Sequence, residues 1–484
     1  MNVGHSANAQ DPQVQPEVQR LNRYPRGSLF KRLFRIGLQA EAVVNLDDVV
    51  GEIDPRIYGH FVESLENGIF HGASLNEDGA ALMGELHPSL IRFSPGRYES
   101  EKNRLALDAF LVFCRSVGAA PYLTLDVHTE TPEDAARWVA HCNAGMSSEA
   151  GLWGLGIGDS GEGQAADTSA DAYVQQAQQF ITAMRAVNPD IQFVAAGMAM
   201  LPGDSQDAEG WNRTVLAGIG GQIEALSFRI RQPDEVGRLE TRDPEQWYHS
   251  ILSAPHSAEE ALQRMGRLIR EVIPDREIGI ALDAFDSMPP AGMPPALQDG
   301  LYVAGMLNVF QRQCEVLKVA NHAHGVNAPL IVKTEGQPAY STPPYFPYLL
   351  YQKMESQLLS LVYWSPVFTA DALGDNISAR NQVPYIDITA TRSPDGKRVV
   401  LGITNRSPLR RVKVMVNLKS EKKRKFRVAA AQMMTGPDPL AANTDGAPDT
   451  VSVQSIRSPR LRFAWLDGDL PPASLMVVEL EKKG

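Results

Sequence analysis

The sequence predicts an α/β protein: a (β/α)8 TIM barrel followed by a C-terminal antiparallel, jelly-roll-like β-sandwich. Apolar strand-like segments alternate with amphipathic helical segments for about 300 residues beyond Ala42, as in a parallel sheet wrapped by helices. Beyond Asp371 the pattern changes to short alternating strands with Asp-Gly turns. The length of 484 residues suits two or three domains, and a doubly wound sheet is the competing topology for the first part.

The first residues differ in composition from the rest of the chain. Residues 1–40 are polar and rich in Pro and Gln, which predicts a disordered tail or a linker. The end of this region, Arg26–Gln39 (RGSLFKRLFRIGLQ), combines basic and apolar residues. A short amphipathic helix for a partner or a membrane surface is therefore an alternative to a plain linker. Strand-like sequence begins at Ala42.

The barrel prediction rests on strand and helix segments that follow one another in order. In the helix Thr131–Asn143, Thr131 suits the N-cap and Pro132 the first helical position. The predicted strands are Ser89–Gly96, Pro121–Glu130, Leu152–Gly158, Ile191–Gly197, Ile223–Ile230 and Ile278–Phe285. The predicted helices are Leu105–Gly118, Thr131–Asn143, Asp171–Val187, Glu259–Ile273 and Gly300–Leu317. The sandwich strands are expected within Val383–Ser407, Arg411–Leu418 and Ser474–Glu481.

The charge balance argues against nucleic acid as a partner. Lys plus Arg is 46 and Asp plus Glu is 57, which gives a net charge of −11. Phosphate binding needs clustered Lys and Arg. The one dense basic run, Lys419–Arg427 (KSEKKRKFR), is interpreted as a solvated loop between strands.

Cysteine usage and hydropathy favour a cytoplasmic protein. Cys114, Cys142 and Cys314 lie far apart in apolar segments, a spacing that suits neither a disulfide framework nor a zinc site. No stretch reaches the roughly 18 apolar residues of a transmembrane segment. The N-terminus lacks the apolar core of a signal peptide, so we expect a cytoplasmic location, or a secreted or periplasmic one if the true start lies upstream.

A glycine-rich stretch raises the question of a nucleotide cofactor. Gly156–Gly161 fits G-x-G-x-x-G, a pattern of dinucleotide-binding loops. In those loops the glycines open a helix directly, whereas the next predicted helix here begins near Asp171. The residues between are polar and acidic and would repel a pyrophosphate. We therefore expect no cofactor.

Five stretches carry a pattern that runs in one order from about Ala42 to Glu481. They are Glu52–Gly72, Pro121–Gly145, Trp153–Gly156, Leu301–Ala320 and Thr435–Thr444. Together they resemble the α-L-arabinofuranosidases of glycoside hydrolase family 51. In that family the first strand belongs to the C-terminal sandwich. The resemblance therefore implies a tail (1–40), a first sandwich strand (41–57), a barrel (58–368) and the rest of the sandwich (369–484).

The resemblance implies a retaining glycosidase, which uses two carboxyl groups about 5 to 5.5 Å apart as acid/base and nucleophile. The family's acid/base follows W-G-[IL]-G-N-E. Trp153–Gly156 match this motif here, but Gly158 stands at the glutamate position. The family's nucleophile lies in D-E-W, where this chain has Asp283, Ala284 and Phe285. Neither glycine nor alanine can transfer a proton or attack an anomeric carbon.

Other positions of the family's substrate site also differ. The R-[WY]-P-G-G-[NC] turn ends in Arg97, and the substrate loop after it is shortened. In the S-L-H-x-Y strand end, Arg229 and Arg231 replace His and Tyr, whereas the glutamate of HFVES is kept as Glu63. The resulting candidates for substrate binding are Glu63, Arg97, His128, Asp159, Arg229 and Arg231. An internal salt-bridge set between the three arginines and Asp159, Asp283 and Asp286 is the alternative interpretation.

An alternative to loss of activity is that other carboxylates have taken over the roles of the two missing glutamates. Glu162 as acid with Asp283 or Asp286 as nucleophile would supply a new carboxylate pair. Asp126, His128 and Glu130 would share one face if their strand continued, which would allow a metal site, although a hydrogen-bonded surface histidine is the simpler interpretation and no metal is expected.

The main hypothesis is a catalytically silent arabinofuranosidase-like protein with a binding, scaffolding or regulatory role. Its possible ligand is a carbohydrate, and a homo-oligomer or membership in a protein complex is expected from the family. The rivals are a diverged, active glycosidase and a structural subunit docked through its N-terminal tail.

Overall fold

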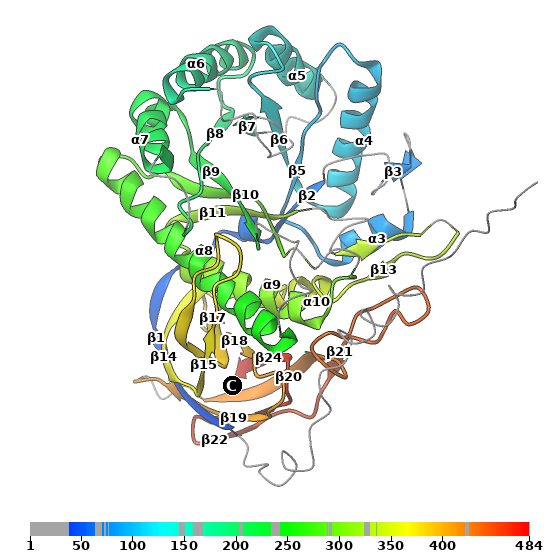
Figure 1. The fold of residues 1–484 in the computed structure, drawn as a ribbon, viewed down its shortest axis with the longest axis vertical. Coiled ribbons are helices and arrows are strands. Elements are labelled where there is room, and N and C mark those ends of the chain that lie inside the picture. The colour runs from blue at the N-terminus through cyan, green and yellow to red at the C-terminus, as the bar shows by residue number, and fades with distance from the viewer. Residues whose placement is uncertain are drawn as a thin grey trace, which may run out of the picture.

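The computed structural model describes residues 38–62, 70–71, 74–75, 77–144, 151–157, 168–202, 207–233, 243–287, 289, 293–323, 330–334, 336–421 and 425–483. They form a closed parallel barrel joined to a curled β-sheet domain, as predicted (Figure 1). The barrel strands are β2 (Gly59–Val62), β5 (Leu90–Phe93), β6 (Ala120–Asp126), β7 (Leu152–Gly156), β8 (Gln192–Ala196), β9 (Ala225–Gln232), β10 (Gly279–Ser287) and β11 (Leu317–His322). Each strand pairs in parallel with the next in the chain, and β11 closes the barrel on β2.

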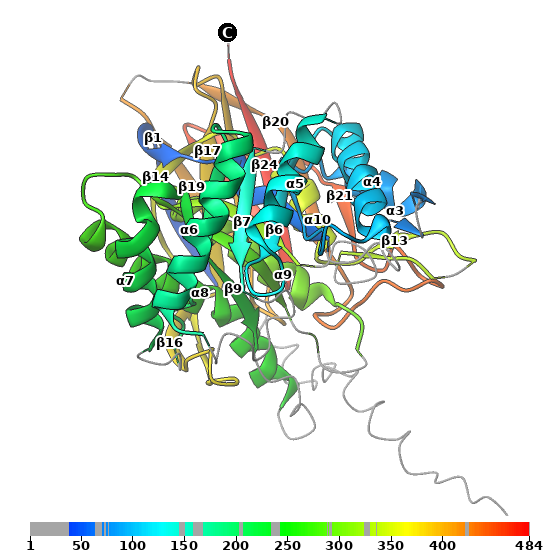
Figure 2. The ribbon, with the colours of Figure 1, turned by 90° about the horizontal axis from the view of Figure 1, so that it is seen from above.

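Helices surround the barrel, as the view from above shows (Figure 2). They are α3 (Glu77–Glu85), α4 (Glu101–Val117), α5 (Pro132–Ala144), α6 (Ala170–Val187), α7 (Asp207–Ile219), α8 (Pro244–Val272), α9 (Leu297–Arg312) and α10 (Tyr345–Tyr351), with short 3-10 turns at Pro55–Tyr58 and Gly220–Gln222. Within the described part of the chain, no helix has both the length and the apolar character needed to cross a membrane.

Two helices show the largest differences from their predicted bounds. The predicted helix Glu259–Ile273 is the second half of α8, which begins at Pro244 and continues through Pro255. A proline inside a helix lacks an N–H donor and crowds the preceding turn. Arg406 Nη1 donates to the carbonyl of Leu252, in the turn before the proline, at 3.2 Å. The predicted helix Gly300–Leu317 instead ends at Arg312, and Leu317 already begins β11.

A ten-stranded sheet forms the second domain. In order across the sheet it consists of β21 (Ser452–Ser455), β20 (Phe426–Thr435), β24 (Ser474–Lys482), β18 (Arg398–Asn405), β17 (Ile386–Arg392), β14 (Gln357–Trp364), β1 (Leu38–Glu52), β19 (Val412–Lys419), β23 (Trp465–Leu470) and β22 (Arg460–Arg462). Its pairs are antiparallel except β1 with β19, which is parallel. Three two-stranded ribbons complete the described strands: β3 (Phe70–His71) with β4 (Ser74–Leu75), β12 (Ile331–Val332) with β13 (Tyr340–Ser341), and β15 (Val367–Ala370) with β16 (Arg380–Pro384).

The N-terminal strand β1 lies in the middle of this sheet, between β14 and β19. Alternate β1 residues Ala40, Ala42, Val44 and Leu46 are buried in the domain core. Strand β14 also belongs to the sheet, so we propose that the boundary between barrel and sandwich lies before Gln357. Strand β1 is thus held by residues more than 300 positions away.

A charged cluster around the buried Asp387 connects the two domains. Arg312, at the end of α9, donates to Asp387 on β17 at 3.1 Å and to Glu259 on α8 at 3.0 Å. Asn308 donates to the other oxygen of Asp387 at 3.0 Å. Burial raises the pKa of Asp387, but the charges of Arg312 and Arg406 outweigh it and hold that pKa below its ordinary value.

Replacing Arg312 tests this connection. Arg312→Met should lower the free energy of unfolding by about 3 kcal/mol, because Asp387 and Glu259 would keep their charges without the guanidinium between them. The matched control is Arg213→Met on α7, whose ion pairs with Glu209 and Glu271 are exposed and should contribute below about 1 kcal/mol. Equal losses in urea unfolding of the two variants would contradict the account.

A buried histidine should make stability depend on pH. His60 on β2 is fully buried and contacts Tyr348, with ring centroids 4.6 Å apart and the rings tilted by 57°, and burial lowers the pKa of His60 to about 3. In the unfolded chain its pKa is about 6.5, so the folded state binds fewer protons and loses stability as pH falls below that value. Between pH 7 and 5 the loss should be about 2 kcal/mol, and His60→Phe should remove it. An unchanged pH slope of urea unfolding in this variant would contradict the assignment.

Candidate site at the carboxyl end of the barrel

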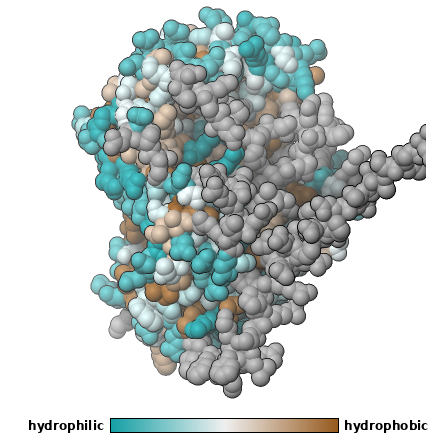
Figure 3. Space-filling view, viewed as in Figure 1, coloured by the Kyte–Doolittle hydropathy of each residue, from teal (hydrophilic) through white to brown (hydrophobic). Residues whose placement is uncertain are grey.

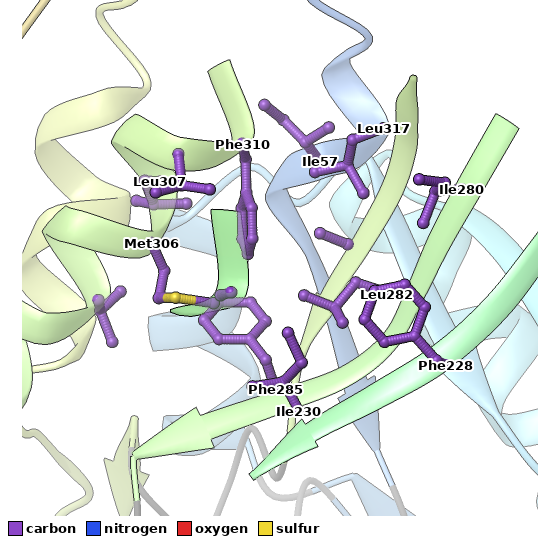
Figure 4. Packing of buried hydrophobic residues seen from close by; sticks show 14 of the residues in the cluster. Ile57, Phe228, Ile230, Ile280, Leu282, Phe285, Met306, Leu307, Phe310 and Leu317 are labelled. Carbon is purple, nitrogen blue, oxygen red and sulfur yellow. The ribbon is translucent and has the colours of Figure 1, made fainter. Parts of the chain in front are cut away.

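Packing on the outer side of β10 sets the orientation of its polar residues. Leu282 and Phe285 lie in the layer between strand and helices, where Phe310 of α9 contacts Phe285 at a ring-centroid distance of 4.9 Å (Figure 4). Both side chains are fully buried. Because these two residues face outward, the polar residues between and after them are directed to the barrel interior.

A β-bulge lies between Leu282 and Phe285. Leu282 pairs with Phe228 of β9 and Ala284 with the next residue, Arg229, so Asp283 is the extra residue. The pairing with β11 is interrupted at the same place, from Leu282 to Phe285. Bulges are rare in parallel pairs and frequent at barrel rims, where they redirect side chains. Here the bulge lets Asp283 and Ala284 lie on the interior side together.

Asp283 is held inside the barrel by a tyrosine. The Tyr122 hydroxyl on β6 donates to its Oδ1 at 2.8 Å, and Asp283 is only 7% exposed. Burial, followed by the nearby Asp283 carboxylate, raises the pKa of Tyr122 well above its ordinary value. The tyrosine is therefore a hydrogen-bond donor at neutral pH and not a base.

Arg92 adds a buried cation to the same interior. It is 1% exposed, its guanidinium lies over the Phe61 ring at 4.0 Å from the centroid, and its Nη1 approaches the carbonyl of Asp283 at 3.5 Å. The contact with Phe61 has the geometry of a cation–π interaction. Nearby, the hydroxyls of Ser94 and Thr124 lie 2.6 Å apart. The carboxyl half of the barrel is therefore polar.

The amino half of the barrel interior is apolar. One residue from each of seven strands forms a separate cluster there: Leu90, Tyr122, Leu152, Val194, Ala225, Ala281 and Val319. Tyr122 belongs to both halves, because its ring packs in this cluster while its hydroxyl reaches Asp283. The polar groups thus lie above a filled layer, as in barrel enzymes whose chemistry is at the carboxyl end of the strands.

The predicted arginines lie at the ends of two different strands. Arg229 is the register partner of Ala284, and Arg231 that of Asp286. Arg229 is partly buried, Arg231 is exposed and Asp286 is 5% exposed. Arg97 follows β5, four strands away from β9 around the barrel, and is exposed. The structure therefore brings Arg229, Arg231, Ala284 and Asp286 together, with Arg97 on the opposite side.

The possible metal site at the end of β6 depended on a strand that does not continue. β6 ends at Asp126, and the next residues form a turn in which Asp126 Oδ1 accepts from the His128 N–H at 2.9 Å. Glu130 Oε1 accepts from the Asp126 N–H at 3.1 Å, and His128 Nε2 lies 3.1 Å from the Thr168 hydroxyl. The predicted strand Pro121–Glu130 was thus too long, and the condition under which Asp126, His128 and Glu130 would share one face is not met. No group of three metal-binding side chains occurs in the described ranges.

Four sequence candidates, Glu63, Gly158, Asp159 and Glu162, lie outside the described residues. Conversely, sequence reasoning missed Tyr122, Arg92 and Thr124 as parts of the site. The signal was present in YLTLD, where Tyr122 and Thr124 alternate with buried Leu123 and Leu125 and so share the interior face.

The structure is thus a TIM-barrel protein with an appended β-domain and a polar carboxyl end of the barrel. Residues 283–474 match the family model for the α-L-arabinofuranosidase C-terminal domain. The intracellular exo-α-(1→5)-L-arabinofuranosidase of Halalkalibacterium halodurans is 22% identical over 456 residues, which cover 79% of this chain and 88% of the relative. A probable α-L-arabinofuranosidase C of Aspergillus niger is 22% identical over 492 residues, covering 87% of this chain and 89% of the relative.

Solved structures show the same architecture. The α-L-arabinofuranosidase of Thermotoga maritima, in an arabinose complex, has a TM-score of 0.78 at 22% identity, over 92% of this chain and 100% of that one. The GH51 α-L-arabinofuranosidase of Thermotoga petrophila has a TM-score of 0.79 at 23% identity, with the same two coverages. Along most of its length the chain is therefore similar to α-L-arabinofuranosidases, and it shares the fold of the GH51 structures.

A substitution of Gly154 tests how tightly the barrel interior is packed beside the site. A Cβ there would lie 2.5 Å from Thr124 Cγ2 and 2.8 Å from the Tyr122 hydroxyl. Gly154→Ala should therefore cost about 1–3 kcal/mol of unfolding free energy. The control is Gly210→Ala on α7, where an added Cβ meets nothing within 4 Å and should stabilise by up to about 1 kcal/mol. A neutral Gly154→Ala in thermal unfolding would show that the interior is looser than described.

Proposed function

We propose that the protein is a catalytically silent arabinofuranosidase-like protein that binds carbohydrate at the barrel mouth in a scaffolding or regulatory role. The observation that carries this proposal is Ala284. It stands at the family's nucleophile position, faces the interior from the bulge of β10, and presents a methyl group beside Arg229. Retention requires a carboxylate there and a second one at the acid/base position, which is Gly158.

The polar interior supports a binding role. Arg92, Tyr122, Thr124 and Asp283 bring guanidinium, hydroxyl and carboxylate groups from three strands to the barrel interior, and a few converging polar groups are typical of a ligand site. The proposed contacts to carbohydrate are those predicted from the sequence: Glu63, Arg97, His128, Asp159, Arg229 and Arg231. Because the Halalkalibacterium halodurans relative is named intracellular, a cytoplasmic location is part of the proposal, as is a homo-oligomer or a complex.

A diverged glycosidase is the second candidate, and Asp283 favours it. Its carboxylate lies next to Ala284 on the interior side and accepts a hydrogen bond from Tyr122. A carboxylate in this position could attack an anomeric carbon if Glu162 supplied the proton to the leaving group. Asp286, two positions beyond Ala284, is the other possible nucleophile.

Turnover of an aryl α-L-arabinofuranoside distinguishes the two candidates. The silent protein should release aryl alcohol no faster than Asp283→Asn, Asp286→Asn or Glu162→Gln variants. A diverged glycosidase should instead lose about a hundredfold or more in kcat/KM in one of these variants. Such a loss would overturn the proposal of a silent protein.

Binding is measured separately from turnover. Arabino-oligosaccharides should raise Tm of the wild-type protein, because a ligand that binds only the folded state stabilises it. Arg229→Ala should remove this shift, whereas Arg213→Ala on the outside of α7 should keep it. No shift with any arabinose-containing ligand would contradict the binding role.

A further inference from the structure

The ribbon of β15 and β16 belongs to the β-domain in the chain but packs on the barrel in space. After β14 the chain leaves the ten-stranded sheet, forms this ribbon, and returns to the sheet at β17. The buried apolar side chains of the ribbon join the hydrophobic cluster that contains the outer layer of the barrel: Phe368, Ala370, Leu373, Ile377 and Val383. β15 lies against α8 (Figure 1), whereas the outer helices at the top of Figure 3 present a largely hydrophilic surface. The ribbon therefore extends the β-domain onto one side of the barrel.

Both ends of the loop between β15 and β16 are fixed on α8. Asp371 directly follows β15, and its carbonyl accepts a hydrogen bond from the Ser250 hydroxyl at 2.8 Å. Arg380 begins β16, and its guanidinium donates to the two carboxylate oxygens of Glu260 at 2.9 and 2.8 Å. Such two-bond pairs between arginine and a carboxylate fix geometry as well as adding energy. The loop is thus held at both ends beside the barrel.

This loop reaches the carboxyl end of β9 through Asn376. Its Nδ2 donates to the carbonyl of Arg231 at 2.5 Å, and its own carbonyl accepts from Gln232 Nε2 at 3.3 Å. Asn376 is 7% exposed and Gln232 is fully buried. The Tyr302 hydroxyl on α9 donates to Gln232 Oε1 at 3.2 Å. The loop therefore binds both of the last two residues of β9.

The end of β9 extends past one of its neighbouring strands. β8 pairs with β9 only as far as Ser227, whereas β10 pairs with it as far as Gln232. Among the described strand pairs, residues 228–232 therefore pair with β10 but not with β8. Backbone N–H and C=O groups need a hydrogen-bond partner wherever water is excluded. The nearly buried Asn376 supplies one to the Arg231 carbonyl.

Two of the arginines predicted for the barrel mouth lie on this extended end. Arg229 and Arg231 alternate with Phe228 and Ile230, which are buried in the outer hydrophobic layer. The arginines therefore face the interior side of the strand. Their direction depends on the backbone of residues 228–232, which Asn376 contacts from the side of the β-domain.

We propose that Asn376 is a positioning residue, which holds the end of β9 that extends past β8 and thereby directs Arg229 and Arg231 into the barrel mouth. The consequence for ligand binding rests on the proposed carbohydrate role of the mouth, whereas the effect on β9 does not. A site that is already held in its binding geometry loses less free energy to ordering when the ligand binds. The β-domain thus contributes to ligand binding by a barrel whose mouth it supports from outside.

Hydrogen exchange of the full chain, followed by mass spectrometry, tests the effect on β9. In Asn376→Ala the backbone amides of residues 229–232 should exchange about tenfold faster, because the strand end can then open locally without global unfolding. Exchange in β6 should stay as in the wild-type protein. Asn376→Asp, which keeps the size of the side chain but offers no N–H donor at neutral pH, should have the same effect as alanine.

Binding of arabinotriose, measured by calorimetry, tests the effect on the mouth. Kd should rise about tenfold in both variants of Asn376. The matched control is Asn443→Ala in the β-domain. Asn443 is 1% exposed, and its Nδ2 likewise donates to a backbone carbonyl, that of Ser341 at 2.9 Å. Asn443→Ala should lower Tm but change neither the exchange of residues 229–232 nor Kd.

Two outcomes would overturn the inference. Unchanged exchange of residues 229–232 in Asn376→Ala would show that the barrel holds β9 without the ribbon. Faster exchange with an unchanged Kd would show that the contact does not position the arginines for a ligand. Absence of binding to the wild-type protein would instead contradict the proposed function, and the exchange result alone would then decide whether Asn376 holds β9.

Discussion

The outward packing of β10 is the constraint on which the candidate site depends. Leu282 and Phe285 must both reach the layer under α9, yet they are three positions apart and a regular strand would turn them to opposite faces. The bulge resolves this conflict by adding one residue between them. As a consequence Asp283 and Ala284 both face the interior. The hydrophobic layer between β10 and α9 thus determines which β10 side chains reach the barrel mouth.

The second domain is coupled to the same part of the barrel. Helix α9, whose Phe310 supports Phe285, ends in Arg312, which binds Asp387 of the sandwich. Helix α9 therefore supports the bulge of β10 and is itself held in place by the β-domain. Neither domain is therefore packed independently of the other.

Much of the architecture could be predicted from local sequence patterns, because alternation and helix periodicity depend on near neighbours. The failures have particular causes. The predicted helix began at Glu259, whereas α8 begins at Pro244 and continues through Pro255. The sequence after Asp126 alternates as a strand would, and the prediction therefore extended the strand to Glu130. In the structure the side chains of Asp126 and Glu130 accept hydrogen bonds from nearby backbone N–H groups and close a turn. The pair Tyr122 and Asp283, separated by 161 residues, and the bulge itself depend on barrel closure and have no local signal.

The most direct test of the central claim is a search for a covalent glycosyl intermediate. The protein is incubated with an activated 2-fluoro arabinofuranoside, which traps retaining enzymes on their nucleophile, and its intact mass is then measured. The account predicts no added mass, because Ala284 cannot form the ester. A single adduct that maps by peptide sequencing to Asp283 or Asp286 would contradict it and show that the barrel has rebuilt its nucleophile next to the original position.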